Sequence, residues 1–519
     1  MKITVTDIIK TSLEKFADYD AVIWPDKDDV IRRTYREFGE DIGRIRAGLH
    51  AIGLTAESWT GEANEEAPGP HIAIVGRSSY PWITVFYGVL TSNGVVVPID
   101  MGLSDEDIID ELNRSDTSCA FVDPLKKTLL ERLASECPKV QKVILLTDKE
   151  GDAAFEKWTE FGAGAPSYAI QDANPDAVAA IMFTSGTTGV SKGVMLTQGS
   201  IGADSANMYY HIPAGAVDFS VLPIHHAFCL TVDWVKAFEQ GATVAVNDSV
   251  GHLAKNIKIF EPSVVLMVPL MVETIYKKLK SVNPLIPKKL VGSQVFGKNL
   301  RHVICGGARL DPMYVEEFKK YGINIWMGYG STETSPVVSF NGERGIRWDS
   351  LGHPVDNTEV EIRDGEVCVR GDIVMKGYYK MPEETAKVLK DGWFYTGDLG
   401  YLDDDGYLYL TGRKKNLIIL ANGENISPEE IEGAFDTTPI VGEIVVVGEG
   451  TNLRALIYPD PDKTRKMKPE QVQKEVEKVI KDYNKKQPSY RRLAGFELRD
   501  EPFPKTSTRK IKRDMITTF

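Results

Sequence analysis

The chain has 519 residues, with 61 lysines and arginines against 74 aspartates and glutamates, so its formal net charge is −13. This length allows more than one domain and several buried sheets. The acidic balance argues against a general nucleic-acid binder, which needs a basic face, and we expect no nucleic-acid partner.

The N-terminal segment, residues 1–20, carries acidic residues where a signal peptide would be apolar. The longest apolar run compatible with a helix, residues 264–272, is far shorter than a membrane span. Five scattered cysteines without a CxxC pair argue against a disulfide framework or a zinc site. We therefore expect a cytoplasmic protein without a transmembrane segment.

Strand and helix patterns alternate through the first third of the chain. Apolar residues recur every three or four positions from Tyr35 to Ile52 and predict a packed helix, whereas the polar stretch 57–70 predicts an exposed loop. Ser104 with Asp107 predicts a helix cap. Strands are expected at residues 71–75, 95–99, 120–122 and 143–146, and a further helix at 82–90. The alternation indicates an α/β fold with largely parallel sheets.

A glycine-rich loop follows a predicted buried strand at residues 178–183. The segment IMFTSGTTGVSKGV, residues 181–194, combines glycines, hydroxyl residues and Lys192. Glycines let the backbone approach a polyphosphate, hydroxyl and N–H groups donate to its oxygens, and a lysine neutralises charge. The spacing differs from G-x-x-x-x-G-K-[ST], because Ser191 stands at a glycine position and Gly193 follows the lysine. The loop predicts phosphate binding outside the P-loop ATPases; the alternative is a plain turn.

Two histidines follow a proline in VLPIHHAFCL, residues 221–230. A metal site would need partners beyond these two adjacent histidines. The better reading is that a histidine of this loop lines a cleft. The later segment 261–280 predicts a strand, a proline turn and an amphipathic helix, which are expected to belong mostly to the core.

Two further strands end in glycine-rich turns. VICGGA, residues 303–308, offers bare backbone against which a flat ring can lie. In IWMGYGSTET, residues 325–334, Tyr329 can stack on a base, Thr332 can donate to a phosphate and Glu333 can hold a hard cation. Read alone, Glu333 would be a solvated surface acid.

The stretch 393–413 carries a candidate ribose site. Asp398 can accept two hydrogen bonds from a ribose diol, and Arg413 after a Thr-Gly turn can contact ribose or phosphate. The three aspartates 403–405 do not fit the D-x-[DN]-x-[DN]-G calcium spacing, so they predict an acidic hairpin turn before Gly406.

A different unit begins near residue 413. NGENISPEEIE, residues 422–432, predicts a β-turn and then a capped helix that starts at Ser427-Pro428. The last 35 residues, from Lys485, carry ten basic and four acidic side chains, a net charge of +6 in an acidic protein. That tail could attract ATP, CoA or an anionic membrane surface, or be a plain solvated face.

Together these motifs resemble, in order, those of the adenylate-forming enzymes: acyl-CoA synthetases, firefly luciferase and peptide-synthetase adenylation domains. The resemblance spans residues 20–513 and implies a large α/β N-terminal domain, 1–412, of packed layers, and a small mobile α+β domain, 413–519, hinged at Lys415. It implies two steps: a carboxylate and Mg-ATP give acyl-AMP and pyrophosphate, and CoA then displaces AMP. The cofactors and substrates it implies are ATP, Mg²⁺ and CoA.

The resemblance also implies roles for individual residues. His226 borders the acid pocket, Thr332 and Glu333 act on phosphate and magnesium, and the loop with Gly423, Glu424 and Asn425 serves thioester formation. FPKTSTRKIKR, residues 503–513, resembles the terminal motif whose second lysine, here Lys510, bonds the carboxylate and the α-phosphate. The residues implied to bind ATP or AMP are Thr184, Ser185, Gly186, Thr187, Thr188, Gly189, Lys192, Gly306, Gly307, Ala308, Gly328, Tyr329, Gly330, Asp398 and Arg413.

Arg509 stands where many members have glycine. A similar T-R-K-[IV]-K-R string and the 261–280 stretch resemble bacterial long-chain fatty acid–CoA ligases, which implies a medium- or long-chain acid. An aromatic acid, a carrier-protein thiol as acceptor and a non-catalytic nucleotide-binding paralogue remain alternatives. Lys510, Glu333 and the intact phosphate loop argue against the last.

Overall fold

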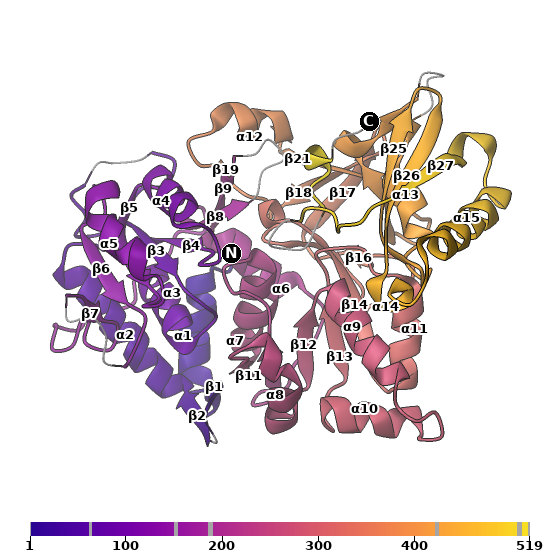
Figure 1. Ribbon diagram of the computed structural model, residues 1–519. Helices are drawn as coiled ribbons and strands as arrows, with labels where there is room; N and C mark the ends of the chain where they lie inside the picture. Colours follow the sequence, from indigo (N-terminus) through magenta and orange to yellow (C-terminus); the bar gives the residue numbers. More distant parts are fainter. Residues whose placement is uncertain are drawn as a thin grey trace. The chain divides into compact units, whose positions relative to one another are not determined.

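The computed structural model describes residues 2–27, 29–61, 65–149, 154–184, 190–420, 425–505 and 511–516. The chain divides into two compact units (Figure 1). The first comprises residues 1–309, 313–359 and 369–394, and the second comprises residues 310–312, 360–368 and 395–519.

Two mixed sheets form the frame of the first unit. The strands of the eight-stranded sheet from β8 to β7 are parallel. At one edge, β9 pairs antiparallel with β8, and β19 pairs antiparallel with β9. Its order is β19 (Gly377–Tyr378), β9 (Lys192–Thr197), β8 (Val178–Thr184), β4 (Val95–Ile99), β3 (His71–Val75), β5 (Thr117–Val122), β6 (Lys142–Leu145) and β7 (Glu156–Lys157).

The nine-stranded sheet is parallel from β14 to β1, with antiparallel strands at both edges. Its order is β16 (His353–Pro354), β15 (Val337–Phe340), β14 (Asn324–Gly330), β13 (His302–Cys305), β12 (Val264–Met267), β10 (Val217–Ser220), β11 (Thr243–Val246), β1 (Asp20–Asp26) and β2 (Asp29–Thr34). The predicted α/β class with largely parallel sheets is confirmed.

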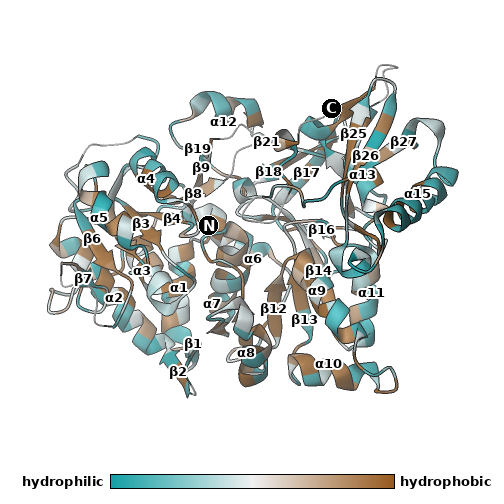
Figure 2. Ribbon diagram, in the orientation of Figure 1, coloured by the Kyte–Doolittle hydropathy of each residue, from teal (hydrophilic) through white to brown (hydrophobic). Residues whose placement is uncertain are grey.

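Helices cover these sheets, and Figure 1 shows α6 and α7 between them. The inner strands β3, β4 and β5 are fully buried, which explains why they read as continuous apolar runs and appear brown in Figure 2. The helices of this unit are α1 (Val5–Lys15), α2 (Tyr35–Ala51), α3 (Tyr80–Leu90), α4 (Asp105–Arg114), α5 (Lys127–Glu136), α6 (Gln198–Asn207), η1 (Phe228–Val235), α7 (Lys236–Gln240), η2 (Val250–His252), α8 (Leu253–Phe260), α9 (Pro269–Lys280), α10 (Lys288–Phe296), α11 (Pro312–Lys320), η3 (Thr332–Thr334) and α12 (Pro382–Val388).

Local signals place several of these helices as predicted. The hydroxyl of Ser104 accepts a hydrogen bond from the backbone N–H of Asp107 at 3.1 Å, so the predicted cap of α4 is confirmed. Helix α2 matches the predicted helix to within one residue. Its apolar face is buried, whereas Ile52 lies beyond the last turn and is 41% exposed.

The second unit contains a β-hairpin sheet and a separate α/β cluster. The strands of the first sheet are β17 (Thr358–Arg363), β18 (Glu366–Gly371), β20 (Leu389–Lys390), β21 (Trp393–Leu402) and β22 (Leu408–Arg413), some of which extend across the boundary. The remaining elements are η4 (Lys414–Asn416), β23 (Ile418–Ile419), β24 (Asn425–Ile426), α13 (Pro428–Gly433), β25 (Val441–Glu449), β26 (Asn452–Pro459), α14 (Pro461–Thr464), α15 (Pro469–Lys485), η5 (Ser489–Arg491), β27 (Leu493–Leu498) and η6 (Arg513–Met515). Strands β25, β26 and β27 form a three-stranded sheet whose apolar core includes α13 and α15.

The second unit contains the predicted acidic turn before Gly406 and the predicted start of a helix at Ser427-Pro428. Gly406 has φ +82° and its N–H donates to the carbonyl of Asp403, so the predicted acidic turn is confirmed. Helix α13 begins at Pro428 as predicted, but the Ser427 hydroxyl does not cap it. It donates instead to the carbonyl of Thr411 at 2.7 Å. The predicted turn at 422–423 lies outside the described residues.

The compact second unit takes in residues 395–412, which the sequence places in the first domain, because the β21–β22 hairpin belongs to its contacts. The boundary at 412/413 remains a prediction. Within the described ranges, no helix has both the length and the apolar character needed to cross a membrane.

Candidate active site

The ends of the phosphate loop meet on the β8–β9 hairpin. Thr184 is the last residue of β8, Lys192 is the first of β9, and the two are paired in the antiparallel ladder. Strand pairing therefore fixes both ends of the loop. Ser185, Gly186, Thr187, Thr188 and Gly189 lie outside the described residues.

The Lys192 ammonium group is held between a carboxylate and an aromatic ring. Its Nζ lies 2.6 Å from Oε2 of Glu384, in the first turn of α12, and 4.9 Å from the ring centroid of Tyr378. The side chains of Lys192 and Glu384 are 14% and 23% exposed. Hydrogen bonds from Lys192 and Lys387 lower the pKa of Glu384 to about 2. Glu384 is thus an anion at neutral pH.

Tyr378 connects this lysine to the predicted metal ligand. Its hydroxyl donates to Oε1 of Glu333 at 2.9 Å, and the N–H of Met375 donates to the Glu333 carbonyl at 2.8 Å. Burial, and then the charge of Glu333, raise the pKa of Tyr378 well above its ordinary value. Tyr378 therefore remains a hydrogen-bond donor. Strand β19 pairs with β9, so the same short segment joins the phosphate-loop hairpin to the Glu333 turn.

An arginine from α4 forms hydrogen bonds to the C-terminal end of the phosphate loop. Arg114 donates to the carbonyl of Ser191 at 2.6 Å and to its hydroxyl at 3.2 Å. The neighbouring Glu111 is buried, and burial raises the pKa of its carboxyl to about 7. These contacts fix the residue directly before Lys192.

The predicted adenine-binding turns lie at the ends of adjacent parallel strands. Strand β13 is followed by Gly306, Gly307 and Ala308, and β14 ends in Gly328, Tyr329 and Gly330. Because parallel strands share their direction, both turns lie at one edge of the nine-stranded sheet. Gly307 has φ +83° with no atom within 4 Å of an added Cβ, and an added Cβ on Gly330 would lie 1.7 Å from the Pro336 carbonyl oxygen. Thr332 and Glu333 follow in η3.

The predicted histidine loop leaves the same edge of this sheet. His226 lies between β10 and the π-helix η1, and its N–H donates to the carbonyl of Pro223 at 3.2 Å. Phe228, two residues on, packs against Gly306, where an added Cβ would lie 3.1 Å from the ring. Burial, and then the charge of His226, lower the pKa of the adjacent His225 to about 3. His225 is therefore neutral at physiological pH.

Asp398 and Arg413 face each other across the β21–β22 ladder of the second unit. Arg413 Nε lies 2.6 Å from Asp398 Oδ1, and the Asp398 side chain is 8% exposed against 41% for Arg413. Hairpin register, rather than separation in sequence, brings these two predicted ribose contacts together.

The remaining predicted residues lie in the second unit. Lys415 is an exposed residue of the short helix η4, and Asn425 is an exposed residue of β24. Gly423, Glu424 and Lys510 lie outside the described residues. The roles assigned to all three therefore stay predictions.

The sequence reading missed Tyr378, Glu384 and Arg114. A signal for the first two was present in GYYKMPEET, residues 377–385, where proline precedes two acidic residues at a helix start. Arg114 offered no local signal, because its partner Ser191 lies 77 positions away.

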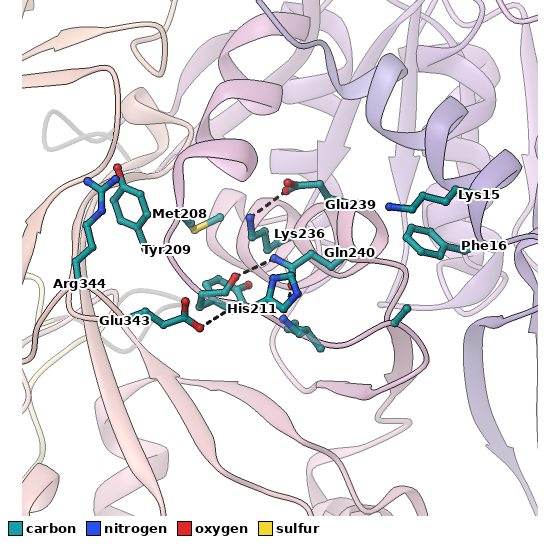
Figure 3. A pocket seen from close by; sticks show the side chains of 13 residues that line it. Lys15, Phe16, Met208, Tyr209, His211, Lys236, Glu239, Gln240, Glu343 and Arg344 are labelled. Carbon is teal, nitrogen blue, oxygen red and sulfur yellow. Dashed lines mark hydrogen bonds and ion pairs between the residues drawn. The ribbon is translucent and has the colours of Figure 1, made fainter.

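A cavity of about 740 Å³ lies elsewhere. Figure 3 shows it between Lys15 and Phe16 at the end of α1, the segment after α6, and Arg344. None of its 13 lining residues belongs to the predicted site. It is a mixed, charged hollow in which Lys236 pairs with Glu239 at 3.1 Å.

The model of the family described as AMP-binding enzyme matches residues 9–379, and that of the AMP-binding enzyme C-terminal domain matches residues 415–518.

Individual relatives have low sequence identity to this chain, but the similarity extends over most of its length. A long-chain-fatty-acid–CoA ligase of Mycobacterium bovis is 27% identical over 483 residues, covering 83% of this chain and 77% of that protein. A chloroplastic long-chain-fatty-acid–[acyl-carrier-protein] ligase of Arabidopsis thaliana is 26% identical over 631 residues, covering 99% of this chain and 85% of that protein. Among solved structures, o-succinylbenzoate CoA synthetase of Bacillus subtilis with ATP and magnesium has a TM-score of 0.76 at 23% identity and covers 98% of both chains. That likeness concerns the fold.

Proposed function

The chain belongs to the AMP-binding enzyme family, and from this premise we propose that it activates a medium- or long-chain fatty acid as acyl-AMP and transfers the acyl group to CoA. The activity of an AMP-forming acyl-CoA ligase follows from the family and from relatives that are named as acyl-CoA ligases. The fatty acid and the residue roles below are our proposal.

One observation supports the proposed site more than any other. Lys192, on a strand of the eight-stranded sheet, and Glu333, in the helix η3 that follows β14, both contact the side chain of Tyr378. The Lys192 ammonium group, which could bind phosphate, and the Glu333 carboxylate, which could bind a hard cation, thus both contact the buried Tyr378. Such an arrangement suits a polyphosphate bound together with a divalent metal.

The residues present fit a magnesium ion held mainly by its nucleotide. Among the described residues no cluster of three or more His, Cys, Asp or Glu side chains could hold a metal by itself. Magnesium typically uses one or two protein carboxylates and takes its other ligands from phosphates and water. Glu333 would supply that carboxylate, oriented by the Tyr378 hydroxyl, and the bound ion would neutralise phosphate charge.

In-line attack of a carboxylate on the α-phosphate needs positioning and charge neutralisation rather than a covalent enzyme intermediate. We assign Thr184, Thr332 and Lys192 to the phosphates and the backbone at Gly306 and Gly328 to the adenine face. Asp398 and Arg413 would bind the ribose, and His226 would border the acid. Lys510 would neutralise the meeting of carboxylate and α-phosphate.

The second step requires CoA to replace pyrophosphate as the reaction partner. We propose that the domain 413–519 reorients about Lys415 and brings the loop of Gly423, Glu424 and Asn425 to the thioester reaction. We also propose a cytoplasmic location, which the five free, buried cysteines support.

Support for a fatty acid comes from the long-chain ligases among the relatives and from the 261–280 stretch and T-R-K-I-K-R string. A second acceptor deserves a parallel test, because the relative that covers 99% of this chain is named as an acyl-carrier-protein ligase.

Pyrophosphate release should be measured across fatty acids of increasing length and benzoate- and cinnamate-type acids, with CoA, a phosphopantetheinylated carrier protein or no acceptor. An apolar pocket gains about 0.8 kcal/mol per buried methylene, so specificity should rise with chain length until the pocket ends. A clear preference for aromatic acids over every fatty acid would overturn the proposed substrate. Thioester formation on the carrier protein alone would replace CoA as acceptor.

A further inference from the structure

The connection between α9 and α10 combines positive charge with an exposed apolar tip. With the last residues of α9 and the first residues of α10, its sequence is KKLKSVNPLIPKKL, residues 277–290. Three lysines precede the tip and two follow it. Between Glu273 and Asp311 the chain has eight lysines and arginines and no aspartate or glutamate. This span is therefore strongly basic, although the whole protein has a net charge of −13.

Leu285 at the tip and Leu290 beyond it face solvent. Leu285 is 88% exposed, the highest value among the large hydrophobic residues in the described part of the chain, and Leu290 in the first turn of α10 is 51% exposed. Pro284 and Pro287 bracket the tip and restrict its backbone. Figure 1 shows this connection at the edge of the first unit beside α10, and Figure 2 shows hydrophobic residues within it.

The demands of folding do not account for all of these lysines. Those in the last turn of α9 interact favourably with the helix dipole, and Lys288 pairs with Glu317 at 3.1 Å. Lys289, however, lies in the first turn of α10, where the dipole disfavours a cation. Lys278 and Lys289 are both exposed. A position that is unfavourable for the helix and open to solvent points to a ligand outside the chain.

We propose that residues 277–290, the docking segment, bind the surface of an anionic phospholipid bilayer. The lysines would lie at the lipid phosphates while Leu285 and Leu290 enter the boundary between headgroups and acyl chains. Basic residues flanking a short apolar tip suit such a surface, since each signal alone binds weakly. A fatty acid partitions into bilayers, so docking there would place the enzyme at a source of its proposed substrate.

The composition favours a bilayer over an acidic protein. Protein interfaces are enriched in aromatic residues and arginine and depleted in lysine. The docking segment has five lysines, no arginine and no aromatic residue. Its charges suit a surface of mobile anionic headgroups rather than a fixed set of partner carboxylates.

Vesicle co-sedimentation of the full chain, without ATP or acid, tests this independently of catalysis. The probes are vesicles of phosphatidylcholine alone and of phosphatidylcholine with phosphatidylglycerol. We expect binding only to the anionic vesicles, weakened by salt. Lys278→Gln with Lys289→Gln should lower the partition coefficient about fivefold per lysine. Leu285→Ser should lower it about tenfold, by loss of apolar burial.

The matched control is Lys485→Gln with Lys486→Gln, which removes the same charge from the basic C-terminal tail. It should bind anionic vesicles like the unmodified protein. Thermal unfolding should confirm that all variants are folded. An equal loss of binding in the control pair, binding that is unchanged by the Leu285 and the Lys278/Lys289 substitutions, or no binding to anionic vesicles would overturn the proposal. Capture by a purely acidic protein surface with no vesicle binding would replace it with a protein partner.

Discussion

The hydroxyl of Tyr378 donates a hydrogen bond to the carboxylate of Glu333, with 2.9 Å between the two oxygens. The same ring lies under the ammonium group of Lys192. The side chain thus orients the proposed magnesium ligand from one side and the proposed phosphate ligand from the other. Five predictions follow from this arrangement and from the assigned roles in the two half-reactions.

Removing the Tyr378 hydroxyl should weaken metal binding. Tyr378→Phe keeps the ring beneath Lys192 but leaves the Glu333 carboxylate without its donor. Loss of such an outer partner typically costs 10–100-fold in metal affinity, so the half-saturating magnesium concentration should rise about tenfold. Pyrophosphate release measured against magnesium at fixed ATP gives the value.

Tyr379→Phe is the control, because that hydroxyl donates to Asp116 at 2.6 Å and not to Glu333. An equal magnesium shift in both variants would show a general packing effect. An unchanged magnesium requirement in Tyr378→Phe would remove its proposed role.

Glu333→Gln should abolish ATP-dependent turnover while the fold is retained, because it removes the proposed magnesium ligand from a half-buried turn. Circular dichroism and turnover at saturating magnesium check both parts. Activity within about tenfold of the unmodified enzyme, a cost of only ~1.4 kcal/mol, would show that the assignment is wrong.

The ion pair of Lys192 with Glu384 should compete with polyphosphate. Glu384→Gln removes the competing charge at constant shape, so magnesium pyrophosphate should bind about two- to fivefold more tightly, the scale of a partly exposed ion pair. Isothermal titration calorimetry measures this without any acid substrate.

Glu383→Gln removes the same charge from the same helical turn and should change binding little. In a Lys192→Met background the effect of Glu384→Gln should disappear. Weaker pyrophosphate binding in Glu384→Gln alone would mean that this carboxylate positions Lys192 rather than competing for it.

A proline at the proposed hinge should separate the two half-reactions. Lys415→Pro fixes φ and should hinder reorientation of residues 413–519. We expect acyl-AMP formation to continue and thioester formation to slow, as measured by pyrophosphate release and by conversion of supplied acyl-AMP. Equal loss of both activities would argue against a hinge there.

Lys510→Ala should give the opposite pattern. Adenylation brings two anions together, and loss of one stabilising donor typically costs about 10²–10³ in rate. Conversion of supplied acyl-AMP and CoA to thioester should stay near the unmodified rate. Lys512, which is exposed, is a better control than Lys505, which pairs with Glu443 at 2.6 Å. Normal adenylation in Lys510→Ala would remove the assigned role.

Local sequence patterns were sufficient to predict the positions of several helices and strands. Apolar periodicity placed α2, continuous apolar runs placed β3 and β4, and a serine with an aspartate three positions on placed the start of α4. These signals work because their energetic partners lie within one turn or one strand. The order of the glycine-rich motifs likewise indicated the family, since each motif is a short continuous string.

Only the tertiary structure decided which side chains meet. Lys192 and Glu384 are 192 positions apart, and Tyr378 and Glu333 are 45 apart; β-pairing of β19 with β9 brings them together. The Ser427 hydroxyl satisfied a nearby strand's carbonyl instead of its own helix, a competition that no local pattern reveals. Side-chain contacts across strands depend on register and burial, and neither is encoded in the spacing of a single motif.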